Sequence, residues 1–354
     1  MSDRYQRQTL LRQIGQTGQA RLAGASVLLV GCGALGTVTA EQLVRAGVGF
    51  LRVVDRDIVE LSNLQRQVLF DEADATHATP KALAAVARLA KINSSVTLDA
   101  VPADVHSANI EELAGLSIGN SKPQTQHPPV DLIIDGTDNV ATRYLINDVS
   151  VKHNLPWIYG AAVGTEGRAM LVVPGKSACL RCIFPTPMNP TELATCDTAG
   201  VLSTVSAMIA SYQSTLAIRY LVGDEVAPAM LSVDVWAGRF KQVDLTDARR
   251  DDCACCAHRQ FDFLDAPASD STTSLCGRDA VQVRPTTATP VDLNQLATKL
   301  AGVGRVQTSR FFVRCTLDAP ESVQLTIFPD GRALIQGLND PVRARTLYAR
   351  FVGA

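Results

Sequence analysis

Residues 27–36 are Val-Leu-Leu-Val-Gly-Cys-Gly-Ala-Leu-Gly, an apolar run that leads directly into a glycine-rich turn. Apolar side chains then recur at helical spacing as far as about Ala46, where two glycines interrupt the pattern. A second apolar run, residues 50–54, follows and ends at Asp55. Strand, helix and strand in this order predict a βαβ unit, and therefore an α/β fold with helices packed on a parallel sheet.

The glycine-rich turn is a candidate nucleotide site. Gly31, Gly33 and Gly36 have the spacing Gly-x-Gly-x-x-Gly, which is weak evidence alone but stronger between a predicted strand and helix. Glycines let the backbone approach phosphate closely, and a helix N-terminus favours negative charge. Asp55 can accept hydrogen bonds from ribose hydroxyls. NAD and ATP fit these features equally well, and a tight turn without a ligand is the third interpretation.

The segment after the second strand favours ATP. Residues 57–67 are Asp-Ile-Val-Glu-Leu-Ser-Asn-Leu-Gln-Arg-Gln. Three of these side chains can bind phosphate oxygens. The Arg66 guanidinium can donate two charge-assisted hydrogen bonds, and the amides of Asn63 and Gln67 are neutral donors. Lys81 is expected in the first turn of a helix with Thr79 as its N-cap, where the helix dipole disfavours a lysine unless it binds an anion. A solvated surface lysine is the alternative, and a dinucleotide needs no such triphosphate clamp.

A later strand adds a carboxylate to the same site. Residues 131–135 predict this strand, and Gly136-Thr137-Asp138-Asn139 follow it. Asp138 can ligate Mg²⁺ as a hard oxygen donor, or it can cap the helix predicted from about Ala141 to His153, and the two roles are compatible. Asp55 and Asp138 are both expected at the carboxyl ends of strands, where ligands of open α/β sheets bind.

Two Cys-x-x-Cys pairs indicate a structural zinc site. They are Cys179 with Cys182 and Cys253 with Cys256, a spacing typical of tetrahedral Zn²⁺ held by thiolates. The long separation between the pairs predicts a clamp joining remote segments, and four thiolates leave no open position for catalysis. Cys255 lies inside the second pair, and the equal spacing of the two pairs favours Cys253 with Cys256 as ligands.

The composition changes after about Asp265. Residues 1–265 are expected to form the first domain, and residues 266–274, rich in Ser, Thr and Ala, predict a linker. Beyond it, two alternating runs flank Pro329-Asp330-Gly331, which predicts a β-hairpin, and a final helix runs to about Phe351. Residues 275–354 are therefore expected to form a small α+β module of unknown role.

Charge and hydropathy exclude several classes of protein. A net charge of −2 without a basic run opposes general nucleic-acid binding. No window reaches about 18 uninterrupted apolar residues, so no membrane span is expected. The polar N-terminus has no signal-peptide core. Nine cysteines in such a chain are expected to be thiols or metal ligands in a reducing compartment, which predicts a cytoplasmic protein.

Four motifs together resemble the MoeB/ThiF family, the bacterial adenylyltransferases related to ubiquitin-activating enzymes. They are the Gly31–Gly36 turn, the Asp55–Gln67 segment, Pro80-Lys81 and Gly136-Thr137-Asp138-Asn139. The resemblance runs from about Arg4 to Asp265. It implies a Rossmann-like adenylation domain with a mixed sheet, usually a homodimer, that uses ATP and Mg²⁺ and holds structural Zn²⁺ on the same four cysteines. The implied nucleotide contacts are Gly31, Gly33, Gly36, Asp55, Asp57, Asn63, Arg66, Gln67, Lys81, Asp138 and Asn139.

The implied reaction joins ATP to the Gly-Gly carboxylate of a ubiquitin-fold sulfur-carrier protein, and yields an acyl-adenylate and pyrophosphate. Because a carboxylate then attacks an α-phosphate, positive charge and Mg²⁺ are needed where the two anions meet. Arg4-Tyr5-x-Arg7-Gln8 matches the family's N-terminal signature, in which the second arginine, here Arg7, reaches the partner subunit's ATP site. Without the resemblance, Arg7 is an ordinary surface arginine.

Two further segments resemble family features. Residues 193–201 resemble the segment with a mobile-loop cysteine, here Cys196, which in some members forms an acyl or disulfide adduct with the carrier. A thiolate is a competent nucleophile on an acyl-adenylate, and a non-essential cysteine is the alternative. Gly160–Gly167 resembles the strand near the carrier tail, with tight strand packing as the alternative. The predicted catalytic residues are Arg7, Arg66, Lys81, Asp138 and Cys196.

The resemblance ends before the C-terminal module. Some relatives carry a rhodanese domain there, but Cys315 lies in a strand pattern rather than an anion-cradling loop. Sulfur is therefore expected from a separate donor, a cysteine desulfurase or a rhodanese. The predicted function is adenylation of a MoaD- or ThiS-like carrier for thiocarboxylate formation, in molybdenum-cofactor or thiamin biosynthesis. The alternatives are a tRNA-modifying relative that activates a carboxylate and a non-catalytic binding module, with an NAD oxidoreductase last.

Overall fold

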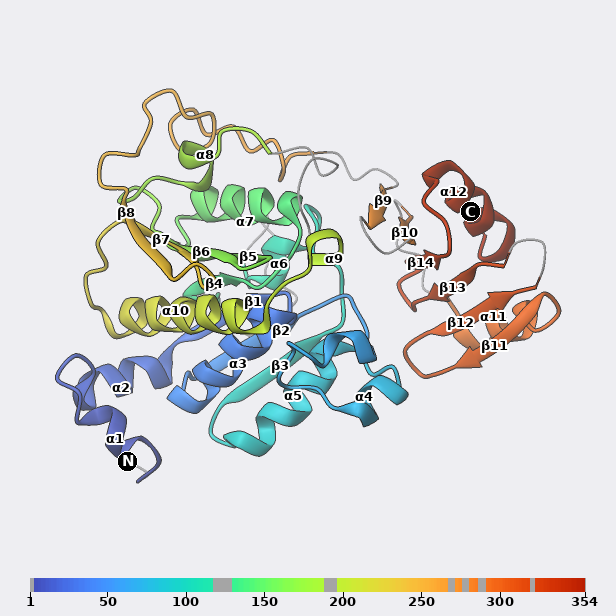
Figure 1. Cartoon of the computed structure of the whole chain (residues 1–354), viewed down its shortest axis with the longest axis horizontal. Helices are drawn as coiled ribbons and strands as arrows, with labels where there is room; N and C mark the ends of the chain where they lie inside the picture. Colours follow the sequence, from blue (N-terminus) through green and yellow to red (C-terminus); the bar gives the residue numbers. More distant parts are fainter. Residues whose placement is uncertain are drawn as a thin grey trace. The chain divides into compact units, whose positions relative to one another are not determined.

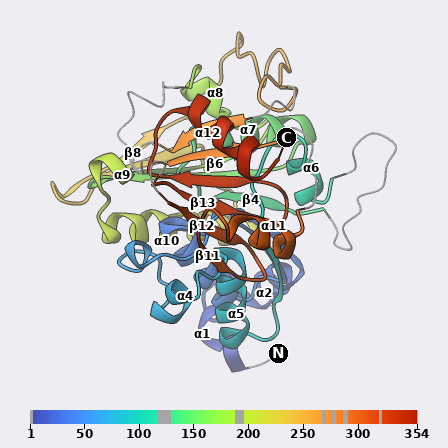
Figure 2. The same ribbon diagram turned by 90° about the vertical axis from the view of Figure 1, so that its right-hand side faces the viewer.

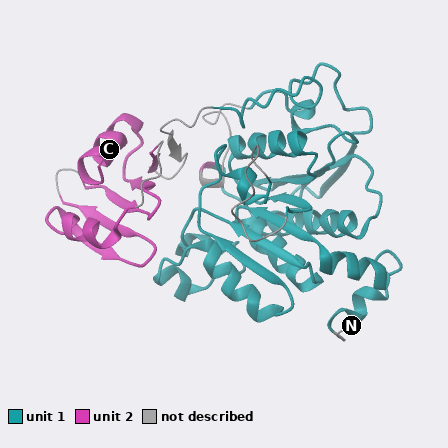
Figure 3. Ribbon diagram, turned by 180° about the vertical axis from the view of Figure 1, so that it is seen from behind, with its two compact units in different colours: residues 1–189, 199–266 teal, residues 190–198, 267–354 magenta. Residues whose placement is uncertain are grey.

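The computed structural model describes residues 3–116, 129–187, 196–266, 271–275, 280–285, 291–318 and 322–353. The chain divides into two compact units, which Figure 3 distinguishes by colour. The first consists of residues 1–189 and 199–266, and the second of residues 190–198 and 267–354.

The first unit is built on an eight-stranded sheet in the order β3-β2-β1-β4-β5-β6-β7-β8 (Figure 1). Strands β3 to β5 of this order run parallel, and β5 to β8 pair antiparallel, so the sheet is mixed as predicted. The strands are β1 Ser26–Val30, β2 Phe50–Val54, β3 Thr97–Val101, β4 Leu132–Asp135, β5 Trp157–Val163, β6 Glu166–Val172, β7 Ala229–Asp234 and β8 Arg239–Asp244.

Helices cover both faces of this sheet, with α7 on one side and α3 and α10 on the other (Figure 1). Leu28 of β1 belongs to the core shared with α7, whereas Leu29 belongs to the core shared with α3. Burial on both faces explains why residues 27–30 of β1 are all apolar. The helices are η1 Asp3–Tyr5, α1 Gln6–Thr9, α2 Gly15–Gly24, α3 Ala34–Ala46, η2 Leu61–Asn63, α4 Glu72–Thr76, α5 Lys81–Ile92, α6 Ile110–Leu113, α7 Val140–His153, α8 Leu180–Ile183, α9 Cys196–Ala199 and α10 Ser203–Val222.

Strand β1 marks the point where the chain changes direction through the sheet. The chain proceeds from β1 to β2 and β3 on one side, and β4 pairs with β1 on the other. Ligands of open α/β sheets bind at such a switch point, beyond the carboxyl ends of the strands. The Gly31–Gly36 turn follows β1 at this edge.

The second unit has a six-stranded antiparallel sheet in the order β11-β12-β13-β14-β10-β9. Helices α11 Leu293–Leu300 and α12 Pro341–Phe351 share one apolar core with it (Figure 2). The predicted hairpin and final helix are confirmed, and Cys315 is buried in β12. The strands are β9 Ser271–Leu275, β10 Ala280–Arg284, β11 Gly304–Thr308, β12 Val313–Leu317, β13 Gln324–Ile327 and β14 Ala333–Gln336.

Two local predictions are wrong. Residues 271–274 of the expected linker belong to β9, because β-branched threonines suit an edge strand as well as a linker. Thr79 does not cap α5, because the helix begins one residue later than expected, with Pro80 at the N-cap position and no side-chain cap. In the part of the chain that the structure describes, no helix combines the length and apolarity needed to cross a membrane.

Candidate nucleotide site and metal centre

The glycine-rich turn packs backbone against backbone. Gly31 has a φ of 89°, and a Cβ on it would lie 2.8 Å from the Gly136 backbone. A Cβ on Gly36 would overlap the Gly31 carbonyl oxygen. At Gly33, by contrast, the nearest atom that a Cβ would meet is Nε2 of Gln67 at 3.9 Å. Protein packing therefore requires two of the three glycines, and Gly33 faces the open side of the turn.

Asp55 braces this turn from β2. Its Oδ2 accepts a hydrogen bond from the Cys32 N–H at 2.6 Å, and its Oδ1 accepts one from the Asp57 N–H at 2.7 Å. Burial raises the pKa of the Asp55 carboxyl, and the nearby Lys81 ammonium partly offsets this effect. The carboxylate predicted to bind ribose thus also fixes the backbone of the glycine turn.

Lys81 is buried, so its interpretation as a solvated surface lysine is wrong. Its side chain is 4% exposed, and its Nζ lies 3.2 Å from Oδ2 of Asp57. The Lys81 N–H also donates to the Asp57 carbonyl, which ties the start of α5 to the segment after β2. A buried cation therefore lies close to both Asp55 and Asp57 at the edge of the sheet.

The segment after η2 supplies the other predicted phosphate donors. Gln67 is 3% exposed, and its Oε1 has no hydrogen-bond partner within the described ranges. Asn63 accepts a hydrogen bond from the Glu60 N–H, which fixes the start of η2. Arg66 donates to the Ser62 carbonyl at 3.0 Å. A buried amide beside Gly33 without a partner for its oxygen is an expensive arrangement unless something else binds there.

Asp138 does not cap α7, contrary to one interpretation of the sequence. The N-cap is Asn139, whose Oδ1 accepts a hydrogen bond from the Thr142 N–H at 3.2 Å. Asp138 is exposed at the carboxyl end of β4. Its carboxylate is therefore available at the same edge of the sheet as Asp55.

Sequence reasoning missed a buried ion pair beneath the Asp138 loop. Asp135 is fully buried, and the Arg143 Nε donates to its Oδ2 at 3.0 Å. Arg143 also donates to the carbonyls of Thr137 and Gly160, which fixes the loop between β4 and α7 against β5. Burial raises the pKa of Asp135, although the Arg143 charge opposes the shift. An arginine one turn into a largely buried helix was the available signal.

The N-terminal motif divides into anchoring residues and one exposed residue. Arg4 donates to the Ile92 carbonyl, Tyr5 contacts Ser95, and Gln8 donates to the Ala46 carbonyl. Arg7 is exposed in α1 and makes no hydrogen bond or ion pair with any residue that the structure describes. The first unit therefore holds this segment in place while Arg7 remains available to another molecule.

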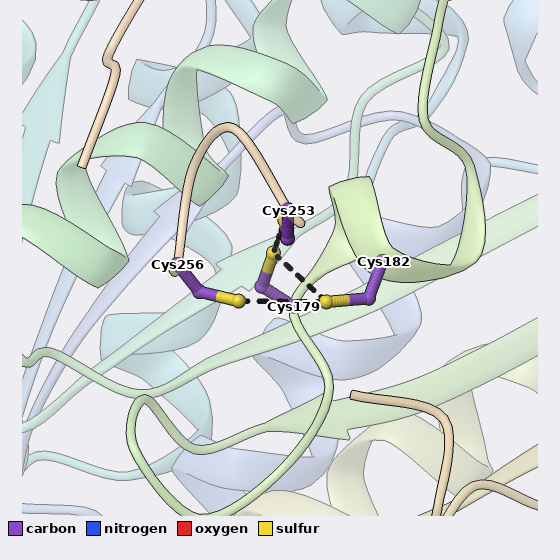
Figure 4. A group of neighbouring side chains, drawn as sticks. All are labelled: Cys179, Cys182, Cys253 and Cys256. Atoms are coloured by element: carbon purple, nitrogen blue, oxygen red, sulfur yellow. Dashed lines mark hydrogen bonds between the residues drawn. The ribbon is translucent and has the colours of Figure 1, made fainter. Parts of the chain in front are cut away.

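The four predicted zinc ligands lie together. Figure 4 shows Cys179, Cys182, Cys253 and Cys256 turned toward one another from two segments, and all four Sγ atoms lie within 4.8 Å of one another. Cys255 lies next to Cys179 but is not one of the four, and its Sγ lies 3.4 Å from Oδ1 of Asp148. Four thiols at this separation suit a tetrahedral ion, and Zn²⁺ is the metal that this donor set favours.

The remaining predicted features have mixed outcomes. Cys196 begins α9, and its side chain lies outside the described part of the structure. A Cβ on Gly160 would overlap Gln213, and one on Gly167 would overlap Ile209. Tight packing against α10 therefore explains both of these glycines.

Comparison with known proteins identifies the family. The ThiF family model matches residues 5–255. The sulfur carrier protein ThiS adenylyltransferase of Bacillus subtilis is 39% identical over 354 residues, with 100% of both chains covered. The sulfur carrier protein adenylyltransferase of Thermus thermophilus is 37% identical over 261 residues, covering 72% of this chain and 90% of the relative. Escherichia coli MccB with MccA-N7isoASN shares the fold, with a TM-score of 0.61 at 19% identity over 72% of this chain and 74% of that chain. The chain therefore belongs to the ThiF family and is an adenylyltransferase.

Proposed function

We propose that this adenylyltransferase uses ATP to activate the C-terminal carboxylate of a ubiquitin-like sulfur-carrier protein that ends in Gly-Gly. The observation that carries the proposal is the buried Lys81 ammonium beside Asp55 and Asp57, at the edge where the turn opens at Gly33. A buried cation next to an open glycine turn suits a polyphosphate. The B. subtilis and T. thermophilus relatives, both named for activity on sulfur carriers, support the carrier as substrate.

The described residues fit ATP in detail. The turn and the N-terminus of α3 would hold phosphates, with Lys81, Arg66, Asn63 and the Gln67 Nε2 donor, which faces Gly33, around them. Asp55 would meet the ribose, and Asp138 would hold Mg²⁺, which neutralises charge on the phosphates when it is bound. A carboxylate oxygen of the carrier attacks the α-phosphorus, the bond to the bridging β-oxygen breaks, and pyrophosphate leaves. The test is the carrier itself: it should acquire one AMP by mass spectrometry, and a carrier without its last glycine should acquire none.

We propose that Arg7 completes the site of a second subunit in a homodimer. Arg7→Ala and Asp138→Ala should each be inactive, but an exchanged equimolar mixture should regain about a quarter of wild-type activity. Half of the dimers then contain both variants, and each of these holds one intact site. Activity assays after subunit exchange measure this. No recovery, with dimer exchange shown independently, would place Arg7 in its own subunit's site or in neither.

We propose that the carrier docks on the β7–β8 turn. Trp236 is 80% exposed and Phe240 is 61% exposed, and exposed large aromatics of this kind mark interaction sites. Strand register places this turn at the nucleotide edge, because Asp234 pairs with both Glu166 and Arg239. The turn is four to five strand spacings from β1, about 22 Å, which roughly seven extended residues of a carrier tail would span.

Replacing both aromatics should weaken carrier use selectively. Trp236→Ser with Phe240→Ser should raise the KM for the carrier about a hundredfold and leave the KM for ATP unchanged, because only the docking contact is lost. Steady-state kinetics with each substrate varied measure this. A short peptide ending in Gly-Gly is the control, since it lacks the docking surface and its KM should not change. An unchanged KM for the carrier places docking elsewhere.

Later steps remain part of the proposal. Sulfur would come from a separate donor, a cysteine desulfurase or a rhodanese, because Cys315 is fully buried in β12 and does not lie in an exposed loop. Cys196 would act after adenylation, as the nucleophile on the acyl-adenylate. Cys196→Ala should therefore leave adenylation intact.

A further inference from the structure

Arg56 is a charged residue at the nucleotide edge that the function described above does not use. It directly follows Asp55, at the carboxyl end of β2. Its side chain is 18% exposed, so part of it can be reached from solvent. Its printed ion pair with Asp104 ties it to the loop that follows β3, the strand next to β2.

The Arg56 guanidinium is paired with carboxylates. Its NH1 donates to Oδ1 of Asp104 at 3.2 Å, and its Nε lies 3.8 Å from Oδ1 of Asp57. The loop that carries Asp104 is itself fixed, because the Asn109 side chain donates to the Asp104 carbonyl at 2.8 Å. Hydrogen bonds of a guanidinium lie in its plane, so an arginine fixed along its edge can still stack through a face.

A second ion pair on the same two strands shows what a purely structural pair looks like. Arg52 of β2 pairs with Asp99 of β3 at 2.7 Å, and its side chain is 3% exposed. The Arg52 NH1 also donates to the Leu113 carbonyl, deep in the unit. Arg56 and Asp104 repeat this pairing beyond the ends of the strands, at the edge of the sheet where Asp55 lies.

The local charge explains why an arginine can stay there. Burial alone lowers the pKa of the Arg56 guanidinium, but the surrounding carboxylates outweigh burial and raise it. These carboxylates come from Asp104, Asp57, Asp138 and Asp55. Arg56 is therefore a permanent cation, and it offsets acidic groups that would otherwise repel a nucleotide.

We propose that Arg56, oriented by Asp104, is the platform on which the adenine ring of ATP stacks. The inference rests on the proposed ATP site and follows from the direction in which bound ATP would run across the sheet edge. Phosphates at the N-terminus of α3 and ribose at Asp55 point the base outward across β2, to the position of Arg56. A planar cation over an aromatic base is a favourable contact, and lysine does not provide the plane.

The test separates base from phosphate. Adenosine and inorganic tripolyphosphate each compete with ATP in carrier-dependent ATP–pyrophosphate exchange, and their inhibition constants are measured. Arg56→Lys keeps the positive charge but loses the planar group. It should therefore raise the inhibition constant of adenosine and the KM for ATP by about tenfold each. The maximal rate and the inhibition constant of tripolyphosphate should not change. Asp104→Asn should raise the inhibition constant of adenosine by a smaller factor, because the Arg56 guanidinium loses the charged partner that orients it.

Asp99→Asn is the matched control on the structural pair. It should lower the unfolding temperature and leave both inhibition constants unchanged. The inference would be overturned if the inhibition constant of adenosine were unchanged in both Arg56→Lys and Arg56→Met. It would also be overturned if the inhibition constant of tripolyphosphate rose while that of adenosine did not. Both results require exchange by the wild-type protein, so a wild-type protein without exchange counts against the proposed function instead.

Discussion

Asp138→Asn should lower carrier-dependent ATP–pyrophosphate exchange by roughly a thousandfold, the loss expected when a transition-state charge loses its stabilising group. The substitution removes a negative oxygen ligand and keeps the size of the side chain. Because Asp138 is exposed and Asn139 caps α7, the fold does not depend on this carboxylate. Calorimetry should therefore show an unfolding midpoint within about 1 °C of the wild-type value.

Asp131→Asn is the matched control for this prediction. Asp131 precedes the same strand, β4, at its opposite end, and its Oδ2 accepts a hydrogen bond from the Ser26 N–H at 2.8 Å. The control variant should keep its exchange activity, because it lies at the edge of the sheet away from the nucleotide turn. Exchange by Asp138→Asn within a few-fold of wild type would remove Asp138 from the metal site.

Disruption of the four-cysteine cluster is the second change from which we expect a large effect. Cys182→Ser should lose most of the bound metal and lower the unfolding midpoint by about 10 °C or more, since the Zn²⁺ that this donor set favours would join Cys179 and α8 to residues 253–256. Metal analysis should find about one Zn²⁺ per wild-type chain. Chelation of the wild-type protein should reproduce the loss of stability.

Cys255→Ser provides the control, because this thiol is buried next to the cluster but contacts Asp148 and Asn147. A serine hydroxyl keeps a donor for Asp148 and removes no proposed ligand. The metal content should therefore remain about one per chain. A full metal content in Cys182→Ser, or its loss in Cys255→Ser, would contradict the ligand set.

The parts of the fold that could be predicted depend on local patterns. The β1–α3–β2 unit was recognisable because β1 is apolar on both faces and a glycine turn follows it. Lys81 was predicted in the first turn of its helix. The helix dipole disfavours a cation there, and this correctly indicated that Lys81 is not an ordinary surface lysine. The cysteine pairs were predicted from equal spacing alone.

The parts that could not be predicted depend on partners distant in sequence. Arg143 bonds to Gly160 and Arg56 to Asp104, and no local pattern indicates either pair. The helix cap expected at Asp138 lies one residue later, at Asn139, and sequence patterns do not resolve a difference of one residue. The β9 strand was hidden because its pairing partner, β10, supplies most of its structural context.

Carrier-dependent ATP–pyrophosphate exchange tests the central claim most directly. Labelled pyrophosphate should enter ATP only when the protein is given a ubiquitin-like carrier that ends in Gly-Gly, because only adenylation of its terminal carboxylate is reversed by pyrophosphate. A carrier that lacks its last glycine should support no exchange. Exchange without any carrier, exchange only with tRNA or a free small acid, or no exchange with any carrier would contradict the account.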